Sequence, residues 1–193
     1  MSTPPTCLLQ VENLTHGPIQ NLSFTWLAGV NWVCGDEGTG KTTLLRLLAG
    51  DVQPTSGKVR VPAGGVFWVD LQNPAHDNTT VQACWDALRA QYPHWNDALL
   101  QDLADALDMH QHREKRLNML STGSRRKVMV VAALASGATV TLMDQPFAAL
   151  DLASIRIIQE VLHEAADHPS RAWIVADYEA PANSPATRVL HLT

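Results

Sequence analysis

The sequence has little of what a secreted or membrane-spanning protein needs. Its 3 cysteines, Cys7, Cys34 and Cys84, are widely spaced and form no C-x-x-C pair. This spacing argues against a disulfide framework or a zinc site and favours a reducing compartment. No early stretch resembles a secretory signal, and no apolar run approaches the roughly 20 residues needed to cross a bilayer. Any membrane-spanning part of a working assembly would therefore come from another chain.

Positive charge is also scarce. Lys and Arg number 14 against 19 Asp and Glu, so the formal net charge is −5. A nucleic-acid-binding surface needs clustered positive charge. The short charged runs at 113–116 and 125–127 are typical of solvated faces, and His110 and His112 have no metal-ligand spacing. The sequence therefore predicts no nucleic-acid partner.

The hydrophobic pattern predicts an α/β fold. A chain of 193 residues with 46% hydrophobic and 17% charged residues is expected to form a soluble globular domain. Apolar strands alternate with helical segments, which favours a mostly parallel sheet covered on both faces. We expect one domain over residues 1–193, with an N-terminal antiparallel β region at 7–27 and a helical subdomain inserted at approximately 78–135. In the β region, strands are predicted at 7–11 and 22–27, with a turn over 13–18.

One stretch organises the chain because it fits the phosphate-binding pattern G-x-x-x-x-G-K-[ST]. An apolar strand at 30–34 precedes it and a helix at 44–49 follows, as this motif requires. The glycines allow backbone N–H groups to surround a polyphosphate, and the helix N-terminus adds positive potential. We therefore predict nucleoside triphosphate binding, with Lys41 on the β- and γ-phosphates and Thr42 on Mg²⁺. The predicted nucleotide-binding residues are Gly35, Asp36, Glu37, Gly38, Thr39, Gly40, Lys41, Thr42 and Thr43.

A second motif indicates where the metal would be held. The apolar strand predicted at 139–143 ends in Asp144, about a hundred residues after the phosphate loop. P-loop enzymes use an Asp at such a strand end to hold Mg²⁺ together with the loop hydroxyl. A strand can also end in Asp because it meets solvent, but the pairing with the loop favours the metal site.

Further motifs in order along the chain resemble the ATP-binding cassette (ABC) ATPases, the motor subunits of ABC transporters. The family signature L-S-G-G-Q is present in altered form, Gln72 is similar to the family's Q-loop glutamine, and the segment 147–151 resembles its D-loop, ending in Asp151. The resemblance covers nearly the whole chain, from Cys7 to Leu192. The signature residues, which in the family contact ATP held by the opposite subunit, are Leu120, Ser121, Thr122, Gly123 and Ser124.

The resemblance implies a P-loop NTPase fold and an energy-coupling ATPase. Its expected cofactors are ATP and Mg²⁺, with Thr42, Gln72 and Asp144 as metal ligands. Its expected partners are a second cassette, alike or different, closing head-to-tail over two ATP, and integral membrane transporter subunits. The expected location is cytoplasmic, peripheral on the inner face of the cell membrane. The compact length is similar to the small bacterial exporter ATPases, including the haem-exporter type.

The sequence departs from the family at catalytic positions. Gln145 follows Asp144 where the family has a Glu that acts as general base, and an amide cannot accept that proton. Asp177 aligns with the family's γ-phosphate-contacting His. The adenine-stacking aromatic is missing, with His16 as the nearest candidate. We therefore assign the catalytic positions to Gln145, Asp177 and Lys41 and expect reduced hydrolysis.

Two other readings remain open on the sequence. One is a non-transport regulatory protein that uses ATP-dependent dimerisation as a switch. The other is a P-loop small-molecule kinase, in which the signature segment would have no role. Co-purification with a membrane subunit distinguishes a transporter subunit from the first, and ATP-dependent dimerisation distinguishes both from a kinase.

Overall fold

The structure is a computed structural model that describes residues 7–193 and divides them into two compact units. The first unit holds the described residues up to Trp68, together with Thr139–Gln145 and Gln159–Thr193. The second holds Val69–Ala138 and Pro146–Ile158. The division therefore falls within helix α5 (Leu152–Ala165).

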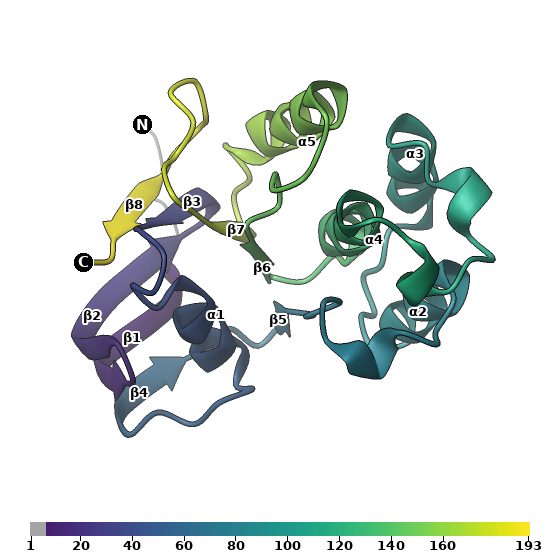
Figure 1. Cartoon of the computed structure of the whole chain (residues 1–193). Helices are drawn as coiled ribbons and strands as arrows, with labels where there is room; N and C mark the ends of the chain where they lie inside the picture. The colour runs from purple at the N-terminus through teal and green to yellow at the C-terminus, as the bar shows by residue number, and fades with distance from the viewer. Residues whose placement is uncertain (1–6) are drawn as a thin grey trace. The chain divides into compact units, whose positions relative to one another are not determined.

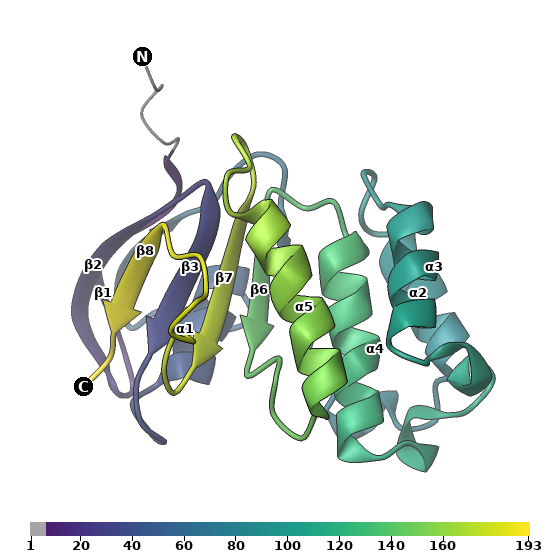
Figure 2. The ribbon, with the colours of Figure 1, turned by 90° about the horizontal axis from the view of Figure 1, so that it is seen from above.

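An antiparallel sheet opens the first unit. Its strands are β1 (Cys7–His16), β2 (Ile19–Leu27) and β4 (Ser56–Arg60), in the order β2-β1-β4 (Figures 1 and 2). The turn predicted over 13–18 is wrong, because β1 continues to His16 and only Gly17 and Pro18 connect the two strands. Asn13 remains in the strand as an irregularity with φ 51°, and its amide donates to Ser23 Oγ at 2.9 Å. Asn tolerates this conformation better than most residues.

A parallel sheet forms the body of the same unit. Its order is β5-β6-β7-β3-β8, and all of its strand pairs are parallel. All of β3 is buried, which explains its continuous apolar character. Its one amide side chain, Asn31, bonds the carbonyls of Leu27 and Gly29 and so stabilises the tight connection from β2. The strands are β3 (Gly29–Cys34), β5 (Val66–Phe67), β6 (Val140–Asp144), β7 (Ala172–Asp177) and β8 (Arg188–His191).

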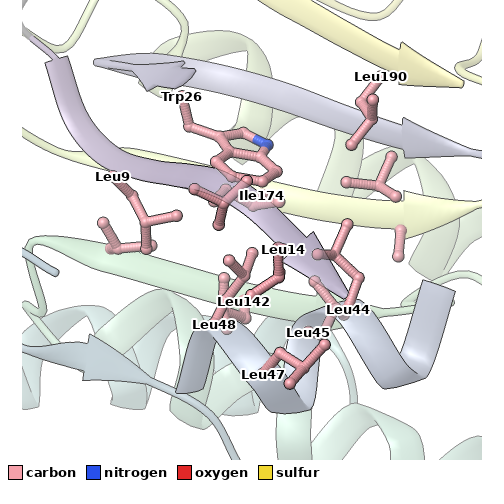
Figure 3. Packing of buried hydrophobic residues seen from close by; sticks show 14 of the residues in the cluster. Leu9, Leu14, Trp26, Leu44, Leu45, Leu47, Leu48, Leu142, Ile174 and Leu190 are labelled. Carbon is pink, nitrogen blue, oxygen red and sulfur yellow. The ribbon is translucent and has the colours of Figure 1, made fainter. Parts of the chain in front are cut away.

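Helix α1 (Lys41–Ala49) joins the two sheets through one hydrophobic core. Figure 3 shows its leucines directed toward side chains from both sheets, including Trp26 of β2 and Ile174 of β7. Full burial of a Leu contributes roughly 1.5–3 kcal/mol, so this helix is held firmly at the end of the phosphate loop. The four buried leucines are Leu44, Leu45, Leu47 and Leu48.

The second unit is helical. A three-residue 3₁₀ turn at Pro74–His76 precedes its first helix, and two more, at His110–His112 and Leu117–Met119, lie between its second and third helices. Trp85 is 1% exposed, and its indole N–H donates to the carbonyl of Val128 at 3.0 Å, so it belongs to the core of this unit. The helices are α2 (Val81–Arg89), α3 (Asp97–Ala106), α4 (Thr122–Ala135) and the first half of α5.

Candidate functional site

The phosphate loop ends in a helix whose first turn is open. Gly40 precedes α1 in the left-handed conformation with φ 99°, and no side chain caps the helix. A Cβ at this position would lie 2.8 Å from Pro18 Cγ, so the loop needs glycine here. The first helical hydrogen bond runs from the amide of Leu44 to the carbonyl of Gly40 at 2.8 Å. The preceding first-turn amides therefore keep their donors for another acceptor.

Lys41 places a buried positive charge within this loop. The residue is 6% exposed, and its Nζ donates to the carbonyl oxygens of Gly35 at 2.5 Å and Asp36 at 2.7 Å. The ammonium forms no ion pair with a carboxylate among residues 7–193. A buried cation whose hydrogen-bond acceptors are neutral backbone carbonyls favours an anionic ligand.

Thr42 and Asp144 meet at the end of the parallel sheet. The Thr42 hydroxyl, from the first turn of α1, donates to Asp144 Oδ2, at the end of β6, at 2.5 Å. One hydroxyl and one carboxylate side by side are hard oxygen ligands of the kind that Mg²⁺ prefers. Gln145 follows with φ 45°, and its backbone N–H donates to the carbonyl of Ala176 in β7 at 2.8 Å. This hydrogen bond fixes the backbone of Gln145 at the end of the strand.

Lys41, Thr42 and Gln145 line one cavity of about 320 Å³ in the first unit, together with the loop glycines Gly38 and Gly40. The predicted residues Gly35, Asp36, Thr39 and Asp144 are not among those that line it. The predicted residues His16 and Asp177 are not among its lining residues. The lining residues are Pro18, Glu37, Gly38, Gly40, Lys41, Thr42, Thr43, Gln145 and Tyr178.

Tyr178 is a cavity residue that the sequence reasoning missed. It follows Asp177 at the end of β7 and is 51% exposed, and its ring centroid lies 4.8 Å from Lys41 Nζ. Asp177 Oδ1 instead accepts a hydrogen bond from the Tyr178 amide at 2.8 Å. An aromatic residue directly after the carboxyl end of a buried strand was the available signal, because ligands bind at such edges.

The Cys34 thiol beside the loop is chemically quiet. Burial raises the pKa of this thiol above the ordinary value, a hydrogen bond with the Ala180 backbone partly offsets this rise, and the carboxylates of Asp177 and Glu179 raise the pKa further. A thiol with a raised pKa stays protonated at neutral pH and is a poor nucleophile. The chemistry of this region is therefore that of the loop and the strand ends.

The signature residues lie in the second unit, at the start of α4. Ser121 is the N-cap, and its Oγ accepts from the Ser124 amide at 3.1 Å. Gly123 has a packing role, because a Cβ there would lie 2.4 Å from the carbonyl oxygen of Ala149. Leu120 precedes the cap, and Thr122 begins the helix.

Asp151 caps helix α5 in the same unit. Its carboxylate accepts from the amide and the hydroxyl of Ser154, both at 2.8 Å, and from Lys127 Nζ at 3.2 Å. These hydrogen bonds hold the pKa of Asp151 well below the ordinary carboxyl value, with the Ser154 amide contributing most. Asp151 is therefore ionised at neutral pH and stabilises the connection between α4 and α5.

Gln72 lies in a segment that Arg125 holds. The backbone N–H of Gln72 donates to Asp70 Oδ1 at 3.0 Å. The Arg125 guanidinium, from α4, donates to the backbone carbonyl of Leu71 on one side of Gln72 and to that of Asn73 on the other. Its third partner is Asp77 Oδ1, at 2.7 Å. The glutamine is thus tied to the helix that carries the signature.

Comparison with known proteins decides the family. The sequence profile described as ABC transporter matches residues 19–148, which include the loop, Gln72, the signature and Asp144. The chain belongs to the ABC transporter family. Its relatives include the taurine import ATP-binding protein TauB of Pseudomonas fluorescens, 31% identical in an alignment of 168 residues that covers 82% of this chain and 60% of that protein. The predicted resemblance to ABC ATP-binding subunits is thereby confirmed.

A second relative is matched over a larger share of its length. The cytochrome c biogenesis ATP-binding export protein CcmA of Gluconobacter oxydans is 32% identical in an alignment of 168 residues that covers 83% of this chain and 77% of that protein. In contrast, the chain spans about three fifths of the length of the TauB relatives. The relatives are therefore named both for import and for export.

Solved structures confirm the predicted fold class. An ATP-binding protein of a Pyrococcus furiosus ABC transporter aligns with a TM-score of 0.72 at 22% identity, over 95% of this chain and 96% of that one. A bacterial ABC transporter cassette solved as a dimer aligns with a TM-score of 0.76 at 18% identity, over 96% of this chain and 94% of that one. Within residues 7–193, no helix is both long and apolar enough to cross a membrane.

Proposed function

We propose that this chain is the energy-coupling subunit of an ABC transporter and binds Mg-ATP at the interface between two cassettes. The observation that carries the proposal is the cavity lined by Lys41 and the open first turn of α1, where the Thr42 hydroxyl also contacts Asp144. The relatives include both importers and exporters by name. The proposal therefore concerns energy coupling and names no transported substrate.

The chain's own groups fit a triphosphate. Lys41 supplies the buried charge, and the first-turn amides of α1 supply N–H donors directed at a developing or resident negative charge. Thr42 and Asp144 would hold Mg²⁺, which when bound neutralises phosphate charge and helps to stabilise the transferring group. Lys41 also braces the loop by donating to the carbonyls of Gly35 and Asp36.

Hydrolysis is proposed to be slow because of what faces this cavity. Gln145 lines it and can orient a water molecule through its amide, but it cannot accept the proton that a glutamate accepts. Loss of a general base typically reduces the rate by about 10²–10⁴, or roughly 3–5 kcal/mol of barrier. Asp177 stands at the position of the family's histidine but does not line this cavity, so the expected loss of rate comes from Gln145.

The second cassette would supply the signature side of the site. Ser121 and Gly123 stand at the N-terminus of α4, where amides and the helix dipole favour an anion. A chain whose own hydrolysis is slow can still serve as one half of such a dimer, with a competent partner at the other site. Gel filtration with and without ATP tests the proposed dimerisation. A purely monomeric chain at saturating ATP would refute the dimer.

The membrane partners are proposed on family membership. The chain would associate with integral membrane subunits and lie peripherally on the cytoplasmic face of the membrane. The test is purification of the detergent-solubilised complex from the native cell through a tag on this chain, followed by identification of the other subunits. Recovery with no membrane protein would favour the non-transport alternative.

Steady-state ATPase measurements test the catalytic part. The wild type, Gln145→Glu and Gln91→Glu are compared, with Gln91→Glu as an exposed control that adds the same charge outside the cavity. We expect Gln145→Glu to raise the rate at least tenfold while the control leaves it unchanged. A brisk wild-type rate that Gln145→Glu does not alter would refute reduced hydrolysis.

A further inference from the structure

The strand end that carries Asp177 presents a different side chain to the phosphate cavity. Asp177 accepts the amide hydrogen of Tyr178, while the Tyr178 ring lines the cavity beside Lys41 and Gln145. The backbone of Tyr178 is fixed as well, because its carbonyl accepts the Gly35 amide at 3.2 Å. The ring is therefore held at the mouth of the phosphate loop by hydrogen bonds on both sides of its own Cα.

The Tyr178 ring lies against the Lys41 ammonium. An ammonium has three donors, and two of them go to the loop carbonyls of Gly35 and Asp36. The Tyr178 centroid lies 4.8 Å from the nitrogen, within the range in which an aromatic face attracts a cation. Ring and carbonyls together restrict where the ammonium can point.

The same ring also forms part of a second cavity. This cavity, of about 660 Å³, is lined by Gly35 and Asp36 of the loop and by Val189 and His191 near β8, among others. Tyr178 therefore lines both the phosphate cavity and this second cavity. A side chain in that position limits the motion of Lys41 without filling the phosphate cavity itself.

We propose that Tyr178 is a positioning residue for nucleotide binding, whose aromatic face holds the Lys41 ammonium ready for phosphate. It acts through Lys41 and not by stacking on the base. This inference rests on the proposed function, because it concerns the same nucleotide site. Tyr178 and not Asp177 would then be the residue of this strand end that tunes phosphate affinity.

Two substitutions separate the ring from the rest of the side chain. Tyr178→Phe keeps the aromatic face and removes the hydroxyl, whereas Tyr178→Leu keeps an apolar side chain and removes the face. The residue is half exposed, so both variants are expected to fold. Val189→Ala alters the second cavity alone and serves as the control for local repacking.

The two ligands are ATP and inorganic tripolyphosphate, titrated by calorimetry against the whole chain. We expect Tyr178→Leu to weaken both ligands by the same factor, between about 2-fold and 30-fold, the range of a cation–π contact. Tyr178→Phe and Val189→Ala should bind both ligands within about 2-fold of the wild type. Equal loss for both ligands is the signature of an effect that passes through Lys41.

Each other result overturns the inference in its own way. Unchanged affinity in Tyr178→Leu would remove the role of the ring, and tighter binding would mean that the ring competes with phosphate for the ammonium. Weaker ATP binding with unchanged tripolyphosphate binding would make Tyr178 a base-stacking residue. Equal loss in Tyr178→Phe would assign the effect to the hydroxyl. A wild type that binds neither ligand would instead refute the proposed function.

Discussion

Arg125 offers the sharpest test of how the second unit holds the Gln72 segment. Its side chain is 11% exposed and reaches three acceptors, the carbonyls of Leu71 and Asn73 and the carboxylate of Asp77. Substitution by Met keeps most of the apolar length and removes every one of these donors. The two carbonyls that flank Gln72 then lose their shared partner.

The expected cost follows from exposure. Hydrogen bonds from a charged donor are worth about 1.5–3 kcal/mol each, and they do not add fully. The Asp77 side chain is 37% exposed, so water replaces much of that contact. The main loss is therefore at the two carbonyls, and we expect Arg125→Met to destabilise the second unit by about 2–3 kcal/mol. Arg125→Lys, which cannot reach all three acceptors at once, should lose about half as much.

Hydrogen exchange measured by mass spectrometry is the assay, because it reports each segment separately. Amides of residues 71–79 should exchange about 30-fold to 150-fold faster in Arg125→Met, which corresponds to the same 2–3 kcal/mol. Amides of β3 in the first unit should not change. Arg116→Met, an exposed arginine of the same unit, is the matched control. Unchanged exchange at 71–79 in Arg125→Met would refute the clamp.

Three further outcomes are expected. Gly123→Ala should lower stability by about 1–3 kcal/mol in urea denaturation despite the better helix propensity of Ala, because its Cβ would meet the Ala149 carbonyl; a stabilised variant would contradict this packing. Thr42→Val removes the hydroxyl that contacts Asp144, so ATP affinity measured by calorimetry should lose its dependence on Mg²⁺, whereas Thr42→Ser should keep it. The depressed pKa of Asp151 means that its stabilising effect is full at neutral pH and is lost as pH falls below about 4. Asp151→Asn should therefore lower Tm at pH 7 more than at pH 3, and an equal loss at both pH values would contradict the ionic cap.

Local chemistry explains why much of the fold was predictable. The buried strand β3, the loop and α1 follow from one apolar run, fixed glycines and a helical leucine pattern. Both elements end where the sequence predicts, although β3 begins at Gly29 and α1 at Lys41, before the predicted starts at 30 and 44. The prediction of a turn over 13–18 was wrong because an Asn with positive φ is as compatible with a strand irregularity as with a turn. Only the pairing partner β2 decides between the two.

The site residues that belong to a sequence motif could be predicted. Those that only the tertiary fold brings into the site could not. The motif supplies Lys41 and Thr42, and the strand end supplies Asp144. Tyr178 has no motif, and its place beside Lys41 depends on β7 lying next to β3 in the sheet. Asp177 illustrates the same limit, since alignment gives its position but not that its carboxylate turns to the following amide.

The bonds from Lys41 Nζ to the carbonyls of Gly35 and Asp36 have a practical meaning for mutagenesis. The side chain is an internal tie of the loop as well as a charge. Replacing Lys41 by a neutral residue would therefore remove the hydrogen bonds that hold the loop and the positive charge of the site in a single change. Loss of ATP binding in such a variant could not be assigned to either effect alone. Thr42 substitutions, which leave the tie in place, are the cleaner way to inactivate this site.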